Sequence, residues 1–376
     1  MALQTVIPVE RLVRRSERVD VLDAAALAAS LRAAVRGEVR VDAGSRAAYS
    51  ADASNYRRVP IAVVIPSSEE DVVATIDVCR AHRVPVVPRG GGTALAGQTV
   101  NEAVVLDFSK RLNRSLAVDM HGKTARVEPG VVADDLEAVT QPLGLTFGPQ
   151  PATHSRCCFG GMLANNCGGM RAQRNGTAVE NVEAMDILLY DGTRVALGWM
   201  KEDDLAAAIR RGGREGDVYA RLRALRDRWA DRIRAGYPKL PRRVSGYNLD
   251  RLLPDEHGRF NLARVIVGSE GTLAVMLDAT VKLLDDPAHR AVVAIGYEDV
   301  FRAADAVPRF LDLAPTAFEG MDDVLKRHME KKGGHHAKSL SLLPRGGGWL
   351  FLELAGKDQA EVRAKIDAAL ARSDGV

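Results

Sequence analysis

The sequence has no long apolar run, few cysteines and few aromatic residues. Its apolar stretches, such as "IAVVI" at residues 61–65, are far shorter than the ~20 residues that span a bilayer. The first 19 residues contain no apolar core of a signal peptide. There are four cysteines, of which Cys157 and Cys158 are adjacent, a pattern that does not suit a normal disulfide framework. We therefore expect a cytoplasmic protein, at most peripheral to a membrane, with no transmembrane segment.

The sequence also lacks a strong excess of either charge, internal repeats and low-complexity tracts. The formal net charge is +3, and basic and acidic residues alternate along most of the chain. A nucleic-acid partner is therefore not expected, and the absence of a repeat excludes solenoids and propellers. A chain of 376 residues is long enough for two or three domains.

Strand-like and helix-like segments divide the chain into sections. Residues 1–57 are polar and predict a helix at 21–35 that lies on its own domain. Residues 58–112 predict a β-α-β unit, in which a Ser cap and acidic first turn open the helix. Its segments are strand 61–66, helix 67–83, strand 84–88 and strand 103–108. Residues 113–285 alternate strands (124–130, 184–192 and 265–268) with helices (131–141 and 217–235).

A third pattern begins at residue 286. It reads strand 291–300, helix 302–313, strand 316–322, strand 349–356 and helix 357–372. Because no closing strand follows, this section is expected to be minimal or cut short. The fold class predicted for the whole chain is α+β.

The stretch "VPVVPRGGGTALAGQT" at residues 84–99 nearly matches a nucleotide-binding P-loop, but Gln98 stands where the lysine belongs. Without that lysine and a following helix, phosphoryl transfer is not supported. A dinucleotide-binding G-x-G-x-x-G turn is also incomplete, because Leu95 occupies the third glycine position. Two readings remain for this loop: a plain glycine-rich turn, or an anion-binding nest of backbone amides beside Arg89.

Two further glycine-rich segments favour the nest. "GPQPATHSRCCFGGMLANNCGGMR" at residues 148–171 is too long for a simple turn, and "VGSEGTLAVMLDATVKLL" at 267–284 joins a glycine turn to a strand. Segments of this kind let the backbone pass close to a bulky ligand. Three such clusters indicate one long ligand.

The motifs "PRGGGTALAGQT", "FGGMLANNCGGM", "YDGTRV" and "GSEGTLAVMLDAT" together resemble the FAD-binding domain of the PCMH-type, or vanillyl-alcohol oxidase, flavoprotein family. The resemblance is greatest to the D-lactate, glycolate and D-2-hydroxyglutarate dehydrogenase branch, and to flavin halves fused to an iron–sulfur half. It implies a PCMH-type FAD-binding domain at 58–285, with subdomains at about 58–112 and 113–285. It also implies a partial, ferredoxin-like substrate or cap domain at 286–376.

The resemblance assigns FAD-binding roles to residues in all three glycine-rich segments. The first loop would bind the diphosphate, the second would line the diphosphate and the flavin, and the third would close the pocket. The residues implied are Arg89, Gly90, Gly91, Gly92, Thr93, Ala94, Gln98, Thr153, Ser155, Cys157, Cys158, Gly161, Asn165, Asn166, Gly168, Gly176, Val182, Glu270, Gly271 and Thr272.

Two positions depart from the family pattern. Thr93 stands where some relatives carry a His that attaches FAD covalently, so non-covalent FAD is expected. Asn175 stands where relatives often have Tyr. This difference lies beside Gly176 and Val182, which the resemblance places near the adenosine.

The sequence does not identify a catalytic set. The "H-x-G-D-G-N-x-H"-like segment, which holds the base and metal ligands in the resembling branch, does not occur, and Asn248 and Glu319 are the only candidates near the flavin. Cys157, Cys158 and Cys167 with His154 lack the four-cysteine pattern of a cluster, so they are interpreted as pocket-lining thiols. The pair His335 and His336 is interpreted as part of a solvated loop. No metal site is expected.

The resemblance therefore implies an FAD-dependent oxidoreductase of a 2-hydroxy acid, such as D-lactate, that passes electrons to a separate acceptor. An iron–sulfur protein or domain would suit as acceptor. The alternative is a truncated FAD-binding module without independent turnover, which needs a missing cap and iron–sulfur half.

Overall fold

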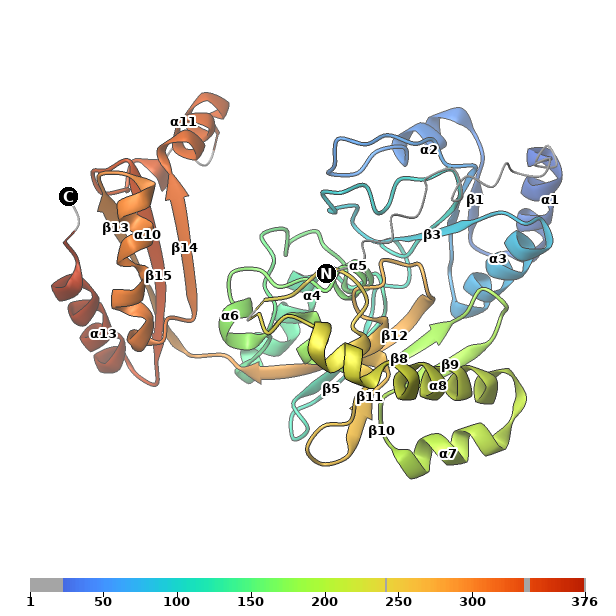
Figure 1. Ribbon diagram of the computed structural model, residues 1–376. Coiled ribbons are helices and arrows are strands. Elements are labelled where there is room, and N and C mark those ends of the chain that lie inside the picture. Colours follow the sequence, from blue (N-terminus) through green and yellow to red (C-terminus); the bar gives the residue numbers. More distant parts are fainter. Residues whose placement is uncertain (1–22, 241, 335–338, 375–376) are drawn as a thin grey trace, which may run out of the picture.

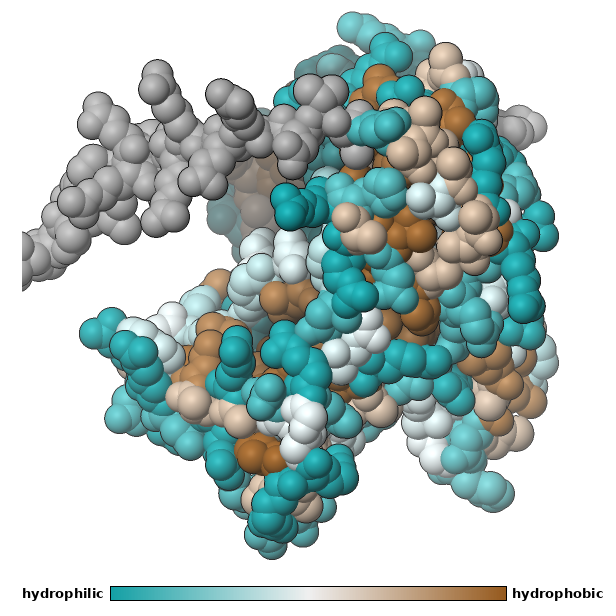
Figure 2. All heavy atoms as spheres, turned by 90° about the vertical axis from the view of Figure 1, so that its right-hand side faces the viewer, coloured by the Kyte–Doolittle hydropathy of each residue, from teal (hydrophilic) through white to brown (hydrophobic). Residues whose placement is uncertain are grey.

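The computed structural model describes residues 23–240, 242–334 and 339–374. The chain forms three main β-sheets, of which the first two pack together and the third belongs to a separate C-terminal unit (Figure 1). Helices cover parts of each sheet, so the predicted α+β class is confirmed. Among the described residues, no helix is both long and apolar enough to cross a bilayer. Figure 2 shows one face of the molecule, where hydrophobic residues gather in small patches between hydrophilic ones.

The first sheet contains the predicted β-α-β unit. Its order is β1-β2-β4-β3, and β4 pairs in parallel with both β2 and β3. The elements are β1 (Glu38–Arg40), β2 (Ala62–Ile65), β3 (Val86–Arg89), β4 (Val104–Asp107), α1 (Ala24–Ala34), α2 (Ala43–Ala48) and α3 (Glu69–Ala81). Every residue of β2 and β4 is buried, as expected for central strands of a covered parallel sheet. Because β1 pairs with β2, the boundary expected at residue 57 falls inside this sheet.

The second sheet is antiparallel, with order β5-β6-β12-β8-β9, and β7 also pairs with β12. Its strands are β5 (Ser115–Asp119), β6 (Thr124–Val127), β7 (Leu145–Phe147), β8 (Val182–Leu188), β9 (Arg194–Leu197) and β12 (Val275–Asp285). Two of its strand pairs, β5-β6 and β8-β9, are joined without an intervening helix, so the expected regular alternation of strands and helices is wrong here. Leu188, Val275 and Leu277 reach the core of the first sheet, which joins the two sheets.

Short helices and a small two-stranded sheet connect the strands of the second sheet. They are α4 (Ala133–Thr140), η2 (Gln141–Leu143), α5 (Phe159–Ala164), α6 (Ala172–Asn175), η3 (Ala178–Asn181), β10 (Trp199–Lys201), α7 (Glu202–Arg211), α8 (Gly213–Gly236), η4 (Leu249–Leu252), β11 (Arg259–Asn261) and α9 (Ala263–Ile266). The strand predicted at 265–268 is wrong: Ala263–Ile266 is one helical turn, and a four-residue apolar run cannot distinguish a strand from a buried helix. The helix predicted at 217–235 lies within α8, whereas α7 was not predicted.

The C-terminal unit is a three-stranded antiparallel sheet with order β13-β15-β14. Its elements are β13 (His289–Tyr297), α10 (Val300–Ala306), η5 (Val307–Leu313), β14 (Ala317–Asp322), α11 (Asp323–Lys332), β15 (Gly348–Gly356) and α13 (Gln359–Arg372). The predicted order of strands and helices is confirmed, with α11 added between the last two strands. Phe310, Leu350 and Leu352 belong to its separate hydrophobic core, to which residues of η5 and α13 also contribute.

A buried ion pair joins the C-terminal unit to the second sheet. Arg171, at the start of α6, donates from Nε and Nη2 to the two carboxylate oxygens of Glu353 on β15, at 3.1 Å each. The Arg171 side chain is only 7% exposed, and Thr316 donates a third hydrogen bond to Glu353. Burial pushes the Glu353 pKa up, but the hydrogen bonds from Arg171 and Thr316 more than offset this, so its pKa lies below the ordinary value.

We expect Glu353→Gln to lower stability at neutral pH by about 1–3 kcal/mol, because the buried Arg171 loses its doubly hydrogen-bonded charge partner and keeps only a longer ion pair with Asp286, at 3.9 Å. A carboxyl group with a depressed folded-state pKa stabilises the fold above its unfolded pKa of about 4.3, and this contribution is lost as the pH falls through the folded pKa. Thermal unfolding should therefore show a deficit for the variant at pH 7 that narrows below pH of about 4. Asp367→Asn, in the exposed pair with Arg363, is the control and should change little. Equal melting temperatures of wild type and Glu353→Gln at pH 7 would show that the pair contributes nothing.

Candidate functional site

A cavity of about 430 Å³ lies where the first two sheets meet. This volume is within the range of ~300–1,000 Å³ typical of ligand pockets. Its walls come from β3 and the loop after it, from α5, from β8 and β12, and from the turn before β12. The cavity is lined by eight of the residues to which the sequence assigned FAD-binding roles: Arg89, Gly90, Gln98, Gly161, Asn165, Glu270, Gly271 and Thr272. All three glycine-rich segments thus meet at one cavity.

The first glycine loop lies directly against the second glycine-rich segment. A Cβ atom added to Gly90 would lie 2.8 Å from Cys158 Cβ, and one added to Gly91 would lie 2.1 Å from the Arg156 carbonyl oxygen. Side chains do not fit at these separations, so glycine is required for the two backbones to come this close. Gly92 also has a φ of +64°, which favours glycine.

The Arg89 guanidinium does not extend freely beside the loop as a fixed positive charge. It donates to the carbonyl oxygens of Ala51 at 2.8 Å and of Tyr49 and Thr99 at 3.4 Å. It also stacks over the Tyr49 ring, 5.4 Å from its centroid. Arg89 therefore holds the loop against the preceding chain, and the remaining groups available to bind an anion in this loop are its backbone amides.

Several backbone amides of these segments are available to a ligand. Within the described part of the chain, the N–H groups of Gly92, Thr93 and Ala94 donate to no protein acceptor. The same is true of Gly161, whose amide belongs to the first turn of α5. Uncommitted amides at a glycine-rich loop and a helix start suit the oxygens of a phosphate. The residues present therefore fit the diphosphate of a dinucleotide such as FAD.

The third glycine-rich segment is conformationally strained beside the cavity. Gly268, Glu270 and Gly271 have φ values of +82°, +53° and +74°, and Glu270 is unusual as a non-glycine residue in this region. The Glu270 N–H donates to the Ala164 carbonyl at 3.0 Å, which ties this turn to the end of α5. Backbone strain of this kind gathers at ligand sites.

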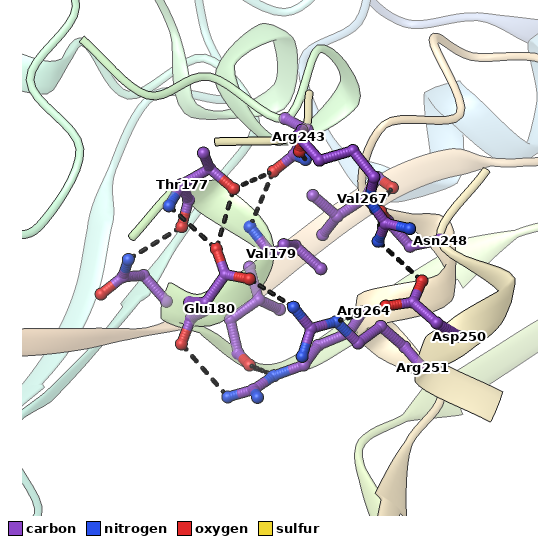
Figure 3. Close-up of polar contacts among 12 residues, drawn as sticks. Thr177, Val179, Glu180, Arg243, Asn248, Asp250, Arg251, Arg264 and Val267 are labelled. Carbon is purple, nitrogen blue, oxygen red and sulfur yellow. Dashed lines mark hydrogen bonds and ion pairs between the residues drawn. The ribbon is translucent and has the colours of Figure 1, made fainter. Parts of the chain in front are cut away.

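The side chains of Asn166 and Asn248 form hydrogen bonds within the protein, and Figure 3 shows Asn248 beside its partners Arg243 and Val267. Asn166 is fully buried; its Oδ1 accepts from Thr177 Oγ1 and the Val179 N–H, both at 2.9 Å, and its Nδ2 donates to the Arg243 carbonyl. Asn248 Nδ2 donates to the Val267 carbonyl at 2.7 Å, while its Oδ1 accepts from Arg243. Both side chains hold loops together through these hydrogen bonds, and neither lines the cavity.

Other expected residues also lie outside the cavity lining. Val182 is fully buried in the core at the start of β8 and lies outside the cavity lining. Gly176 ends α6, where a Cβ would meet the Glu180 side chain. Glu319 lies exposed on β14 of the C-terminal unit. The other residues that were expected to bind FAD but do not line the cavity are Gly91, Gly92, Thr93, Ala94, Thr153, Ser155, Cys157, Cys158 and Gly168.

The four cysteines are free thiols and none of them lines the cavity, so the expected pocket-lining role of Cys157, Cys158 and Cys167 is not seen at this cavity. Cys157 and Cys158 are buried, and burial raises the pKa of the Cys158 thiol to about 11, so it stays protonated at neutral pH. In the described residues, no three His, Cys, Asp or Glu side chains are grouped to hold a metal ion. His154 instead pairs through Nδ1 with Asp134 at 2.5 Å. His335 and His336 lie outside the described residues.

Part of the cavity wall was not predicted from the sequence. Met185 on β8 lines it together with Phe108, Asn101 and Ile266. These positions belong to ordinary strand and loop patterns, so only the sheet pairing reveals that they face one cavity. Met276 on β12 also lines it, but it belongs to the third glycine-rich segment, which was expected to close the pocket. Apolar walls with a few polar groups are typical of cofactor sites.

Comparison with known proteins agrees with this geometry. Residues 60–198 match the family model of the FAD binding domain, and residues 286–375 match that of the FAD linked oxidases, C-terminal domain. D-2-hydroxyglutarate dehydrogenase of Pseudomonas putida is 32% identical over 340 residues, which are 89% of this chain and 34% of that protein. Glycolate oxidase subunit GlcD of Bacillus subtilis is 29% identical over 281 residues, covering 74% of this chain and 49% of that protein.

A further curated relative is the mitochondrial D-lactate dehydrogenase [cytochrome] of Kluyveromyces lactis, 25% identical over 87% of this chain and 48% of its own length. The chain thus spans between about a third and a half of the length of these relatives. Among solved structures, an alkyldihydroxyacetonephosphate synthase has the same fold, with a TM-score of 0.63 and 17% identity over 93% of this chain and 58% of that one.

Proposed function

We propose that this chain, which combines a FAD-binding domain with the C-terminal domain of FAD-linked oxidases, binds FAD non-covalently and oxidises a 2-hydroxy acid to a 2-oxo acid. The observation that supports this most directly is the meeting of three glycine-rich segments at one cavity, with an uncommitted backbone amide at Gly161 in the cavity wall. The further uncommitted amides, at residues 92–94, belong to the first glycine loop beyond the cavity lining. The relatives that act on D-2-hydroxyglutarate, glycolate and D-lactate support the substrate class.

In this proposal, the amides of Gly92, Thr93, Ala94 and Gly161 bind the diphosphate oxygens, and the contact of Gly90 and Gly91 with residues 156–158 keeps these donors in place. A diphosphate that is held and not transferred needs donors rather than a catalytic lysine, which agrees with Gln98 at the lysine position of a P-loop. When bound, FAD supplies the two-electron acceptor that oxidation of a hydroxy acid requires. The apolar cavity wall, with Met185 and Met276, excludes water around the cofactor.

Non-covalent attachment rests on Thr93, which has no nucleophilic ring nitrogen to bond to a flavin. The chain would then pass its electrons to a separate acceptor. Because the chain spans a minor part of its relatives, a FAD-binding module without turnover of its own is the second candidate.

The test is anaerobic reduction of purified, FAD-loaded protein by hydroxy acids. We expect D-lactate, D-2-hydroxyglutarate or glycolate to bleach the flavin absorbance band, while L-lactate serves as the stereochemical control. Acid precipitation should release all the flavin into the supernatant, because no bond holds it. Protein that is yellow but is bleached by none of the three acids would favour the second candidate, and flavin retained in the acid pellet would contradict non-covalent binding.

A further inference from the structure

Positive charge is concentrated in the second half of α8 and the loop that follows. Residues 221–243 contain nine Lys and Arg but only two Asp and Glu, giving a formal charge of +7, whereas the whole chain carries +3. The rest of the chain is therefore net negative. A local charge asymmetry of this size steers association with partners of the opposite sign.

The charges and apolar side chains of α8 share one face of the helix. One side of α8 carries Arg221, Leu225, Arg228, Trp229 and Arg232. Their successive spacings of four, three, one and three residues place them on the same face of a helix. The buried residues Tyr219, Arg226 and Ile233 point the other way, toward the body of the protein. Between residues 221 and 232, neither acidic residue, Asp227 or Asp231, falls on the outward face.

The outward arginines carry uncompensated charge. Arg223, Arg226 and Arg234 form ion pairs with Glu202, Asp227 or Asp231. In contrast, Arg221, Arg228 and Arg232 are exposed and form no ion pair within the described chain. Lys239 and Arg242, in the following loop, are also exposed without such a pair. Five cations are thus left for an external partner.

Apolar side chains stand among these cations. Trp229 and Leu225 are each 37% exposed and Leu240 is 61% exposed. The Arg228 and Arg232 guanidinium carbons lie 5.1 and 5.2 Å from the Trp229 ring centroid, so the indole is within cation–π distance of two cations. Tryptophan and arginine are enriched among the residues that contribute most to protein–protein binding.

This surface adjoins the wall of the cavity. Tyr237, at the end of α8, donates to the Tyr247 carbonyl at 2.6 Å. The Tyr247 hydroxyl in turn shares a hydrogen bond of 2.8 Å with Thr272 Oγ1, and Thr272 lines the cavity. A partner seated on the end of α8 and on the loop would therefore lie beside the cofactor site.

We propose that the face made by Arg221, Leu225, Arg228, Trp229, Arg232 and Leu240, here called the basic α8 surface, docks an acidic protein that receives the electrons of the oxidised substrate. This deepens the proposed function and rests on it for the role of the partner. An anionic membrane is the less suitable occupant, because both neighbouring guanidinium groups lie over the Trp229 ring, so that charged groups accompany the indole rather than a continuous apolar surface.

The test uses a purified acidic [2Fe–2S] ferredoxin as probe and FAD-loaded full-length protein, with binding measured by isothermal titration calorimetry. We expect binding at low salt that weakens at least tenfold at physiological salt, and at least tenfold in Arg228→Glu/Arg232→Glu. Trp229→Ala should weaken binding several-fold. The matched control is Arg302→Glu/Arg363→Glu on the C-terminal unit, where both arginines are exposed; this variant should bind like wild type.

Each other outcome overturns the proposal. If the wild type does not bind ferredoxin, or if Arg302→Glu/Arg363→Glu loses as much ferredoxin affinity as Arg228→Glu/Arg232→Glu, the basic α8 surface is not a docking site. Binding of anionic phospholipid vesicles or of duplex DNA that is tighter than ferredoxin binding, and is lost in Arg228→Glu/Arg232→Glu, would assign the surface to that partner instead. Because binding is measured without a hydroxy acid, a protein that binds ferredoxin but is not bleached by substrate would contradict the proposed function and leave the surface intact.

Discussion

Gly91→Ala should weaken FAD binding by the purified protein. The added Cβ would lie 2.1 Å from the Arg156 carbonyl oxygen, which is backbone and has no flexible end to move aside. The first glycine loop must then separate from residues 156–158, which moves the amides of Gly92 to Ala94 away from the second segment. Overpacking of this kind costs about 1–3 kcal/mol, and we expect FAD affinity to fall at least tenfold, measured by fluorescence quenching of added FAD.

The control for this variant is Gly236→Ala. Gly236 differs from Gly91 in that nothing lies within 4 Å of the methyl group that it would gain. It ends α8, where alanine is the better helix former. Its FAD affinity should equal that of wild type. If Gly91→Ala retained wild-type affinity, the contact between the two segments would not be needed for the cofactor site.

Gly161→Leu should remove FAD binding while leaving the fold intact. Gly161 lines the cavity from α5, and a Cβ there would meet no atom within 4 Å, so the leucine side chain has room only because the cavity is present. Filling that space excludes the ligand. Because leucine is also favoured over glycine in a helix by roughly 0.5–1 kcal/mol, the thermal stability of the cofactor-free protein should not fall. We expect FAD affinity to drop about a hundredfold or more.

Gly161→Ala provides the graded comparison. It adds one methyl group instead of four carbon atoms, so its loss of affinity should be clearly smaller than that of Gly161→Leu. A Gly161→Leu protein that still binds FAD like wild type would place the cofactor elsewhere in the molecule, whereas an unfolded variant would contradict the open space seen around Gly161.

Local patterns in the sequence predicted those elements that carry their own signals. The helix α3 begins after the Ser68 cap, whose hydroxyl accepts from the Asp71 N–H, and the apolar runs before and after it became parallel strands of one sheet. The run at residues 265–268 failed because its four apolar residues fit a strand and a helical turn equally well, and Asn261, which accepts from the Ala263 N–H, opens a helix there.

The candidate site was predictable where glycine is required by close approach of two segments, as at Gly90 and Gly91, or favoured by a positive φ, as at Gly271. It was less predictable where polar side chains were involved. Asn166 and Asn248 look like ligand-binding amides in the sequence, but both satisfy their hydrogen bonds within the protein, and only tertiary contacts reveal this. Met185 was missed for the same reason, since its strand β8 meets β12 only in the folded sheet.

The most direct test of the account is a titration of cofactor-free protein with FAD by isothermal calorimetry, carried out side by side on wild type and Gly161→Leu. The account predicts one FAD per wild-type chain and no measurable uptake by the variant, with both proteins folded by circular dichroism. Failure of the folded wild type to take up FAD, or equal uptake by both proteins, would contradict the assignment of this cavity to FAD.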